Sequence, residues 1–445
     1  MKKRPLLRRD ALRGTPGTAT RLSRDGSATR QPMQASPLGP SHQERRMKWT
    51  TRKARLALAW AVSPLTAGAQ VIDDMNEIRY ATPVDDKQAP RGKAELVDGK
   101  DGKAVHFAFD DKCSGAFFMR RVKADASWDA AAGFSFWVKG DGSDRLGGIE
   151  IVHADDFSKR YAVAFSIKET NWRKVVVPWR DVIPETAAAP FLGGGAMKPS
   201  AFGNFWFGKW WYWRDYAAHG YAVDQVALEP KIDLPPDPPP PAGAPLAKTA
   251  AKLKAGQPVA IVTMGDSLTD FSHWANKETN WPTLLAKRIE EEMKSKVTLV
   301  NPAIGGTELK QNLVLMPRWA ESAKPDLVTV CFGFNDWSSG MRGPHFQETM
   351  SFAVDRIRRM TGAEVLLITT CPAMERWETM AELAQAARDV AKAKNTGLAD
   401  TDKAFHAAGD ADPAARAKLY CRDKTHLGPE GHRVVANAVF EALRR

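Results

Sequence analysis

The sequence predicts a multidomain protein, in which an antiparallel β-sandwich of the jelly-roll type is followed by a three-layer α/β domain. Two observations carry this prediction. Over residues 70–232 apolar side chains alternate with smaller or polar ones, which is typical of half-buried antiparallel strands. Over residues 257–445 short apolar runs alternate with amphipathic helical patterns, which is typical of a parallel sheet covered by helices. A length of 445 residues also exceeds that of one ordinary domain.

The positive charge of the chain is concentrated at its N-terminus. The formal net charge is +12, and residues 1–69 alone contain 15 basic and 3 acidic side chains. The rest of the chain therefore carries no net charge, so it offers no general basic surface for phosphates and predicts no nucleic-acid binding. Residues 1–46 are rich in Arg, Ser, Thr, Gly and Pro. We expect a disordered basic extension there, or an artefact of start-site assignment if translation begins at Met47.

Residues 47–69 have the organisation of a secretory signal peptide. Basic side chains come first, an apolar run covers residues 56–65, and Ala-Gly-Ala precedes Gln70. The apolar run is too short for a transmembrane segment. We therefore expect a secreted or periplasmic protein of a bacterium. The alternative interpretation is a weakly apolar surface helix, because a tryptophan, a serine and a proline interrupt the run.

Cysteine and histidine spacing gives no sign of a bound metal. The sequence contains four cysteines. In an oxidising compartment Cys371 and Cys421 can form a disulfide bridge, or they can remain free buried thiols. Both interpretations stay open. Paired C-x-x-C and H-E-x-x-H spacings are missing from the sequence, so we expect no metal and no cofactor.

The first folded region contains a series of short predicted strands separated by turns rich in Gly and Asp. Apolar residues alternate at residues 105–109, 134–138, 149–151, 161–167 and 175–177. Such spacing indicates an antiparallel sandwich. Residues 133–140 and 172–179 resemble the jelly-roll, galactose-binding-like modules that accompany bacterial carbohydrate-active enzymes. The resemblance implies a carbohydrate-binding role for this region.

An aromatic stretch lies near the end of the predicted sandwich. Eight of the twelve residues at positions 205–216 are Phe, Trp or Tyr. Flat rings stack on the apolar faces of sugars, but the same rings also fill a sandwich core or seal it against the next domain. Both interpretations stay open. The candidate substrate-binding residues of this stretch are Trp210, Trp211 and Trp213.

Residues 233–256 form the predicted linker, and most residues between 234 and 245 are proline. Polyproline segments are extended and semi-rigid. We therefore expect the linker to hold the sandwich and the α/β domain apart, with residues 246–445 able to fold alone.

The α/β region is organised around residues 259–270. An apolar run at residues 259–264 leads into Gly-Asp-Ser-Leu at residues 265–268, which indicates a buried parallel strand that ends in a tight turn. Ligands bind at the carboxyl ends of such strands, and a serine on a sharp turn presents its Oγ to them. Ser267 is therefore the candidate nucleophile.

The partners that a serine nucleophile needs follow downstream. A base must accept the hydroxyl proton, and a carboxylate must orient that base. Two residues separate Asp423 from His426, so the carboxylate can reach Nδ1 while Nε2 faces the serine. The reaction also needs donors for the developing oxyanion. Candidates follow two predicted strands, at residues 305–306 and 333–336.

Four blocks of the sequence resemble the SGNH (GDSL) hydrolase family. They are residues 265–268, Asn301 with Gly306, residues 333–336 and residues 423–426. The resemblance covers residues 257–445 and implies a flavodoxin-like parallel sheet.

The same resemblance implies a role for each matching residue. Ser267 is the implied nucleophile, His426 the base and Asp423 the orienting acid. The implied oxyanion-hole donors are the N–H groups of Ser267 and Gly306 and the side-chain amide of Asn335. In one departure, Gly305 stands where many family members carry a small polar residue, which leaves Gly305 and Gly306 as alternative donors.

Side chains near these blocks are candidates for substrate contact. His273 and Trp274 follow the nucleophile turn, and Trp337 lies in a polar and aromatic loop after the third block. Asp336 is the expected structural acceptor that shapes its own loop. Polar and aromatic loops suit a hydroxyl-rich leaving group and a small acyl pocket.

The sequence therefore predicts an exported serine esterase, a carboxylic ester hydrolase that acts through an acyl-enzyme. Its expected substrate is an acetylated polysaccharide or oligosaccharide, from which it removes small acyl groups. Two alternatives stay open. One is a lipid or thioester hydrolase, similar to a lysophospholipase or an arylesterase. The other is a non-catalytic carbohydrate-binding protein, which the intact blocks disfavour.

Overall fold

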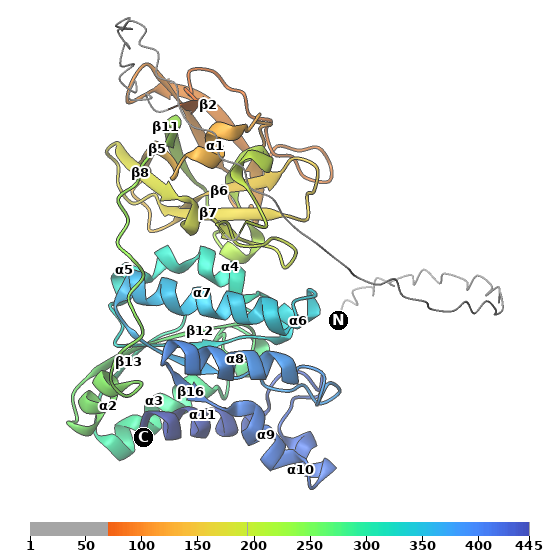
Figure 1. Cartoon of the computed structure of the whole chain (residues 1–445). Helices are drawn as coiled ribbons and strands as arrows, with labels where there is room; N and C mark the ends of the chain where they lie inside the picture. The colour runs from red at the N-terminus through yellow and green to blue at the C-terminus, as the bar shows by residue number, and fades with distance from the viewer. Residues whose placement is uncertain (1–69, 194, 445) are drawn as a thin grey trace, which may run out of the picture. The chain divides into compact units, whose positions relative to one another are not determined.

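The computed structural model describes residues 70–193 and 195–444, so the predicted extension at residues 1–46 and the predicted signal peptide at residues 47–69 lie outside the described residues. The described residues belong to one compact unit, which holds a β-sandwich and an α/β domain (Figure 1). Both predicted folds are confirmed. Among the described residues, helices with the length and apolar character of a membrane span are absent.

The sandwich consists of two antiparallel sheets. One has the strand order β2-β3-β11-β5-β8, with β1 paired to β11, and the other has the order β4-β10-β6-β7-β9. The strands are β1 (Val71–Asp73), β2 (Gly92–Asp98), β3 (Lys103–Phe109), β4 (Ala116–Phe118), β5 (Gly133–Gly140), β6 (Leu146–His153), β7 (Arg160–Ser166), β8 (Arg173–Pro178), β9 (Ile183–Pro184), β10 (Phe202–Lys209) and β11 (His219–Glu229). The short helices are α1 (Ala126–Ala130), η1 (Trp179–Asp181), η2 (Pro199–Ala201) and η3 (Trp211–Trp213).

Aromatic side chains fill the space between the two sheets. Phe107 of β3 stacks on Phe207 of β10 with ring centroids 4.9 Å apart, and Phe205 meets a ring of β5 edge to face at 5.4 Å. These rings are buried because alternate residues of each strand point inwards. Of the aromatic residues at positions 205–216, Trp211 and Tyr216 alone are exposed. Most of the aromatic stretch therefore forms core.

Five parallel strands form the sheet of the α/β domain, in the order β13-β12-β14-β15-β16. This flavodoxin-like order is the one that the sequence resemblance implies. The strands are β12 (Val259–Gly265), β13 (Val297–Val300), β14 (Leu327–Cys331), β15 (Glu364–Ile368) and β16 (Gly397–Ala399). The helices are α2 (Ala247–Lys254), η4 (Trp274–Asn276), α3 (Trp281–Met293), α4 (Leu309–Val314), η5 (Met316–Arg318), α5 (Ala320–Ala323), α6 (Phe334–Ser338), α7 (Gly343–Thr361), α8 (Ala381–Lys394), α9 (Thr401–Gly409), α10 (Pro413–Lys418) and α11 (Pro429–Arg444).

Alternate residues of β12 face opposite helical layers. Val262 and Met264 pack in one cluster with α4, α7 and α8, whereas Val259 and Ile261 pack in another with α2, α3, α9 and α11. Figure 1 shows α7 and α11 on opposite sides of the sheet. Burial on both faces explains the continuous apolar run of this strand in the sequence.

The sandwich and the α/β domain share one apolar core. Ile183, Tyr212 and Trp213 of the sandwich belong to the same buried cluster as Leu309 and Leu313 of α4. Charged side chains of the α/β domain surround this contact: Arg318 lies 3.0 Å from Asp215, Arg356 and Arg359 lie 2.5 and 2.8 Å from Asp181, and Lys310 donates to the carbonyl of Ala189 at 2.8 Å.

The proline-rich linker does not hold the two domains apart, so this expectation is wrong. Asn395 of the α/β domain donates to the carbonyl groups of Pro241 and Gly243 at 2.7 Å each, and Arg359 pairs with Asp237. Polyproline character sets the extended conformation of the segment. The association of the domains is set instead by their apolar faces, because burial stabilises by about 25 cal/mol per Å².

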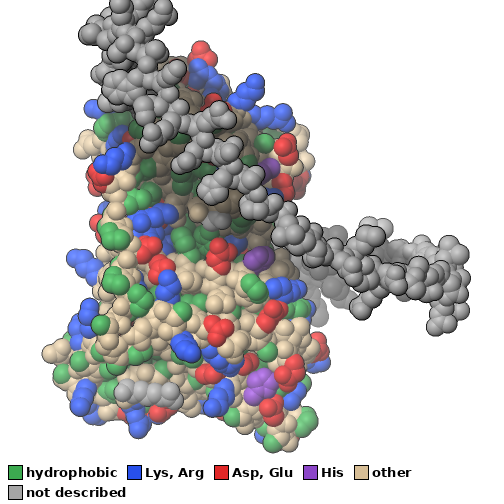
Figure 2. Space-filling view, in the orientation of Figure 1, with side chains coloured by type: hydrophobic (Ala, Val, Ile, Leu, Met, Phe, Trp, Pro, Cys, Tyr) green, Lys and Arg blue, Asp and Glu red, His purple; other side chains and the backbone are tan. Residues whose placement is uncertain are grey.

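Charged side chains of both signs are interspersed on the face shown in Figure 2. Broad areas of a single sign are not seen on the described residues of this face. The mixture agrees with the balance of basic and acidic residues beyond residue 69.

Two buried carboxyl groups of the sandwich lie close to the contact between the domains. Glu150 of β6 is 0% exposed and Glu185 is 3% exposed, and the Arg160 Nε atom lies 3.5 Å from the first carboxylate and 3.9 Å from the second. Burial raises the pKa of Glu185 to about 7 in spite of Arg160, and Glu308, the residue that caps the start of α4, adds to the rise. Burial also raises the pKa of Glu150. The two domains therefore meet at carboxyl groups that favour the protonated form.

We expect the free energy of unfolding to decrease as the pH rises from about 4.5 to about 7, because the pKa of Glu185 is raised in the folded protein. A raised pKa in the folded state means that the stabilisation is complete below the unfolded value of 4.5 and is lost as the pH rises through about 7. Glu185→Gln should remove this dependence, which amounts to up to about 3 kcal/mol. Urea unfolding of both proteins at pH 4.5 and pH 8 measures the difference, and Glu77→Gln, at an exposed position, is the control. Identical pH dependence in Glu185→Gln and the wild type would contradict the account.

Candidate active site

Ser267 lies in the turn that follows β12. The strand ends at Gly265, where a Cβ atom would lie 2.3 Å from Thr269 Oγ1, so the close approach of the turn requires glycine. The neighbours of β12 are β13 on one side and β14 on the other. Open α/β sheets bind ligands at such a switch point, outside the carboxyl ends of the strands. Ser267 therefore occupies the end of a parallel strand, as predicted.

His426 and Asp423 lie beside Ser267, on the loop before α11. His426 Nε2 is 2.9 Å from Ser267 Oγ, and His426 Nδ1 is 2.6 Å from Asp423 Oδ2. The N–H groups of Thr425 and His426 donate to Asp423 Oδ1 at 3.2 and 3.1 Å. Burial raises the pKa of Asp423, but the hydrogen bonds from His426 and from these N–H groups outweigh burial and hold the pKa below its usual value. The ionised carboxylate can therefore orient the imidazole towards the serine.

Two asparagine side chains brace the nucleophile turn. Asn276 Nδ2 donates to the carbonyl oxygens of Ser267 and Asp270 at 2.7 and 2.8 Å. Asn301 Nδ2 donates to Thr269 O at 2.9 Å and to a threonine hydroxyl of β12 at 2.8 Å. Asn301, which belongs to the second sequence block, thus ties the turn to its strand.

The loop after β13 brings two glycines next to the serine. The Gly305 N–H donates to Asp270 Oδ2 at 2.8 Å and is therefore engaged within the protein. Gly306 has a φ of +83°, which favours glycine. Within the described part of the chain, the N–H groups of Gly306 and Ser267 have no hydrogen-bond acceptor. Of the two alternative glycines, Gly306 is thus the one whose N–H is available to a ligand.

The Asn335 side chain approaches the same region from the start of α6. Its Nδ2 donates to Thr307 O at 3.0 Å and has a longer contact, 3.4 Å, with Asp266 Oδ2. The second N–H of the amide is therefore weakly held. Weakly held or unengaged donors in a pocket are suited to a developing negative charge.

Asp270 connects the glycine loop to the sandwich. Its Oδ2 accepts from the Gly305 N–H and from Arg214 Nη2 at 2.9 Å, and its Oδ1 accepts from the N–H and the hydroxyl of Ser272. Arg214, which follows η3 of the sandwich, also donates to Ser272 Oγ at 2.7 Å. Burial raises the pKa of Asp270, but the hydrogen bonds from Ser272 and Gly305 and the charge of Arg214 bring it below its usual value. An ionised carboxylate thus fixes the loop that carries Gly306.

Sequence reasoning missed the contact between Asp270 and Arg214 and its effect on the glycine loop. Asp270 had a local signal, because an Asp followed two residues later by Ser272 favours a side-chain-to-backbone turn. Arg214 had no such signal, since it lies 56 residues before Asp270 and in another domain.

Two further carboxyl groups are buried beside pocket residues. Asp266 Oδ1 accepts from the Leu268 N–H at 2.9 Å, and Asp336 Oδ1 accepts from the Leu309 N–H at 3.0 Å. Burial raises the pKa of Asp266 to about 6 and that of Asp336 to about 8. Asp336, which is 0% exposed, is therefore largely uncharged at neutral pH and anchors α4 to its own loop.

A pocket of about 550 Å³ opens at Ser267. Apart from Trp274 and Phe334, the residues that line it are polar or glycine, and they include the predicted residue His273. The His273 ring stacks on His426 with centroids 4.2 Å apart. Burial lowers the pKa of His273, and the proximity of His426 lowers it further. The pocket therefore presents hydrogen-bonding groups and one exposed indole ring, that of Trp274, to a ligand.

The other candidate substrate-binding residues lie in different surroundings. Trp211 is 46% exposed, and its Cη2 atom lies 3.6 Å from the position that a Cβ on Gly306 would take. Trp213 is 1% exposed and packs in the core shared by the domains, while Trp210 is half-buried against it. The Trp337 ring centroid lies 4.9 Å from the Cζ atom of Arg342 and 4.6 Å from that of Arg376. The structure thus places Trp211 next to the pocket residue Gly306, but Trp210, Trp211, Trp213 and Trp337 are not among the residues that line the pocket itself.

The four cysteines, all within the described residues, are free thiols: Cys113, Cys331, Cys371 and Cys421. Of the two alternatives for Cys371 and Cys421, the structure has the free thiols. Across residues 70–193 and 195–444, no group of three or more His, Cys, Asp or Glu side chains is arranged to hold a metal ion.

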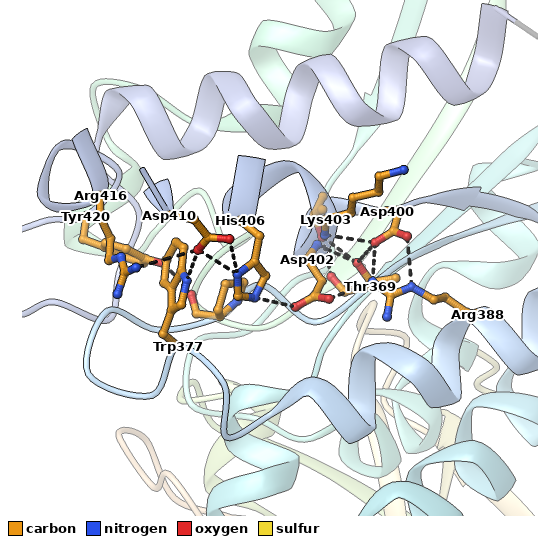
Figure 3. A network of polar contacts seen from close by, with 12 residues as sticks. Thr369, Trp377, Arg388, Asp400, Asp402, Lys403, His406, Asp410, Arg416 and Tyr420 are labelled. Carbon is orange, nitrogen blue, oxygen red and sulfur yellow. Dashed lines mark hydrogen bonds and ion pairs between the residues drawn. The ribbon is translucent and has the colours of Figure 1, made fainter. Parts of the chain in front are cut away.

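A second network of polar side chains lies outside the pocket (Figure 3). His406 of α9 has Asp402 at 3.7 Å on one side and Asp410 at 3.0 Å on the other. Arg388 of α8 lies 2.7 Å from both Asp400 and Asp402. Asp400 caps the start of α9 and Asp410 follows its end. The network therefore joins α8 to both ends of α9, and it does not line the pocket at Ser267.

Comparison with known families finds a match for each part of the chain. Residues 263–434 match the GDSL-like Lipase/Acylhydrolase family. Residues 60–197 match the Carbohydrate binding domain (family 11). The first range includes Ser267, Asp423 and His426. Both resemblances found in the sequence are thereby confirmed.

Individual proteins show more distant similarity. A mannan endo-1,4-beta-mannosidase from Bifidobacterium adolescentis is 26% identical over 121 residues, and the chain spans only 12% of the length of that protein and 26% of its own. An acetylxylan esterase from Geobacillus stearothermophilus is 19% identical, with a TM-score of 0.35 over 43% of this chain and 96% of the other. A lipase/acylhydrolase from Enterococcus faecalis is 23% identical, with a TM-score of 0.36 over 42% and 95% of the two chains.

Loss of either Ser267 or His426 is expected to abolish ester hydrolysis. If the hydroxyl and the imidazole act as the predicted catalytic unit, Ser267→Ala and His426→Ala should each lower kcat for 4-nitrophenyl acetate by about 10⁴-fold or more. His345→Ala, at an exposed position on α7, should retain activity. Substantial hydrolysis by either active-site variant would contradict the geometry-based assignment.

Asp270→Asn is expected to lower kcat more than it raises KM. The neutral amide no longer attracts Arg214 and holds the Gly305 N–H less firmly, so Gly306 is less well placed when charge develops. We expect a loss of roughly 10- to 100-fold in kcat for 4-nitrophenyl acetate. Asp410→Asn, in the network of Figure 3, is the matched control and should behave as wild type. An unchanged kcat in Asp270→Asn would show that the loop needs no such support.

Proposed function

We propose that this chain, which combines a GDSL-like lipase/acylhydrolase domain with a carbohydrate-binding domain, is a serine esterase that removes small acyl groups from a glycan. The observation that carries the proposal is the 2.9 Å contact between His426 Nε2 and Ser267 Oγ, in a pocket whose lining residues are polar or glycine apart from Trp274 and Phe334. The acyl group that suits this pocket best is acetyl, and the substrate is an acetylated polysaccharide or oligosaccharide.

In the proposed first half-reaction, Ser267 Oγ attacks the ester carbonyl carbon while His426 Nε2 takes the hydroxyl proton. Asp423 keeps the imidazole oriented and stabilises the imidazolium. The N–H groups of Ser267 and Gly306 and the Asn335 amide donate to the oxyanion. The tetrahedral intermediate collapses as His426 gives its proton to the ester oxygen of the sugar, the sugar departs with a free hydroxyl, and the acyl group stays on Ser267.

In the second half-reaction, His426 takes a proton from a water molecule that attacks the acyl-enzyme carbonyl. The same donors stabilise the second oxyanion. Collapse of this intermediate breaks the bond to Ser267 Oγ, which regains its proton from His426, and the carboxylic acid leaves. The residues already in the pocket thus supply every proton transfer of the cycle.

The lining of the pocket favours a short acyl group over a fatty acyl chain. A long chain needs sustained apolar surface, since each buried methylene contributes about 0.8 kcal/mol. Trp274 and Phe334 are the apolar members of the lining, and the rest is polar or glycine. Such a lining suits sugar hydroxyls on the leaving-group side and a methyl group on the acyl side.

Action outside the cytoplasm is part of the proposal, because a polymeric glycan does not cross a membrane and residues 47–69 read as a signal peptide. Protein exported from a bacterial host should begin at Gln70. Mass spectrometry of the exported protein would contradict this if the N-terminus were intact.

The specificity constant is expected to fall with acyl chain length. On 4-nitrophenyl esters from acetate to octanoate, each added methylene meets polar groups and gains little burial, so kcat/KM should decrease along the series. Steady-state kinetics with the wild type measures the trend. A steady rise towards octanoate would instead favour a lipid or thioester hydrolase.

A further inference from the structure

A groove on the sandwich adjoins the catalytic pocket. Its volume is about 530 Å³, and its lining is mainly apolar, with Pro83, Val84, Phe117, Met119, Trp210 and Trp211. Val84 and Met119 remain 47% exposed, and Trp211 remains 46% exposed. Apolar side chains of one groove are thus left half in water, which is typical of a binding surface.

Trp211 lines the groove and lies next to Gly306, which lines the catalytic pocket. Its indole lines the groove, and its Cη2 atom lies 3.6 Å from the position of a Cβ on Gly306, the glycine whose N–H faces the pocket. Arg214, three residues later, lines the catalytic pocket itself. The groove and the catalytic pocket are therefore neighbours at Trp211 and Gly306.

Exposed aromatic rings gather at this junction. In the described residues, the large aromatic side chains that stay exposed are Phe157, Trp211, Tyr216, Phe271 and Trp274. Four of these five lie in two short segments, residues 211–216 and 271–274. The ion pair between Arg214 and Asp270 joins the two segments at 2.9 Å. Exposed rings are therefore concentrated where the two domains meet the pocket.

We propose that the groove at Trp211 binds sugar residues of the substrate next to the one that carries the ester, so that one glycan chain contacts both domains. The inference rests on the proposed esterase function and extends it to a second binding region. Trp211 stacks on a sugar ring between the catalytic pocket and the groove, and Val84 and Met119 contact the next sugar residues of the glycan.

The chemistry of the groove favours a glycan over an acyl chain. Half-exposed flat rings cover the apolar face of a sugar while its hydroxyls stay in water. An acyl chain gains from burial of its whole circumference, which a groove of half-exposed side chains does not provide. The region of the chain that matches a carbohydrate-binding family, residues 60–197, includes the groove residues between 81 and 119.

The test compares acetylated xylooligosaccharides and mannooligosaccharides of one to six sugar residues. For wild type, kcat/KM for acetate release should rise with oligosaccharide length. We define the gain as kcat/KM for six sugar residues divided by kcat/KM for one. In Trp211→Ala the stacking contact is lost, so this gain should fall by roughly 3- to 10-fold. Met119→Ala should reduce the same gain. Because the readout is a ratio within each variant, a general loss of activity does not imitate the effect.

Matched controls come from the same domain. Phe157→Ala removes an exposed ring, and Leu96→Ala removes an aliphatic side chain that is 45% exposed, as Met119 is 47% exposed. Both controls should keep the wild-type gain. Equal gains in all five proteins, or no gain with length in wild type, would overturn the groove proposal while leaving the esterase proposal intact. Failure of wild type to release acetate from any of these sugars would overturn the proposed function, and the groove proposal with it.

Discussion

The arrangement of the pocket depends on the buried carboxylate of Asp270. One of its oxygens accepts hydrogen bonds from the Gly305 N–H and from Arg214, and the other accepts a hydrogen bond from the Ser272 N–H. The first contact engages one glycine, whereas the N–H of the next, Gly306, has no acceptor among the described residues. The contact with Arg214 ties the same loop to the sandwich. A charge that is 2% exposed is costly unless it is paired and hydrogen-bonded, so the two domains have to be docked for this loop to be well placed.

Much of the fold could be predicted because its signals are local. The apolar run before Ser267 and the alternation in the sandwich each depend on the environment of one strand. Ser267, Asp423 and His426 were also predicted together, and the structure places them within hydrogen-bonding distance, because the carboxyl ends of parallel strands and the loop before the last helix meet at one edge of the sheet. Their catalytic roles belong to the proposed function.

The contacts between the domains could not be predicted, since they join residues with no pattern in common. Trp213 and Trp211 are two positions apart in one aromatic stretch, yet the first is buried in the shared core and the second lines the groove beside Gly306. Composition identifies the stretch but not which ring points where. The prolines of the linker predict an extended segment, but separation of the domains did not follow, because apolar surfaces and ion pairs decide association.

The central claim is that the sandwich helps to build the catalytic pocket through Arg214. The most direct measurement is the rate at which a fluorophosphonate modifies Ser267, because the phosphoryl oxygen of the adduct occupies the oxyanion position. Intact-protein mass spectrometry gives this rate for wild type and for Arg214→Gln. The account predicts modification of Arg214→Gln that is slower by roughly 10-fold or more at an unchanged unfolding midpoint. Equal rates in the two proteins would show that the α/β domain forms its pocket without the sandwich.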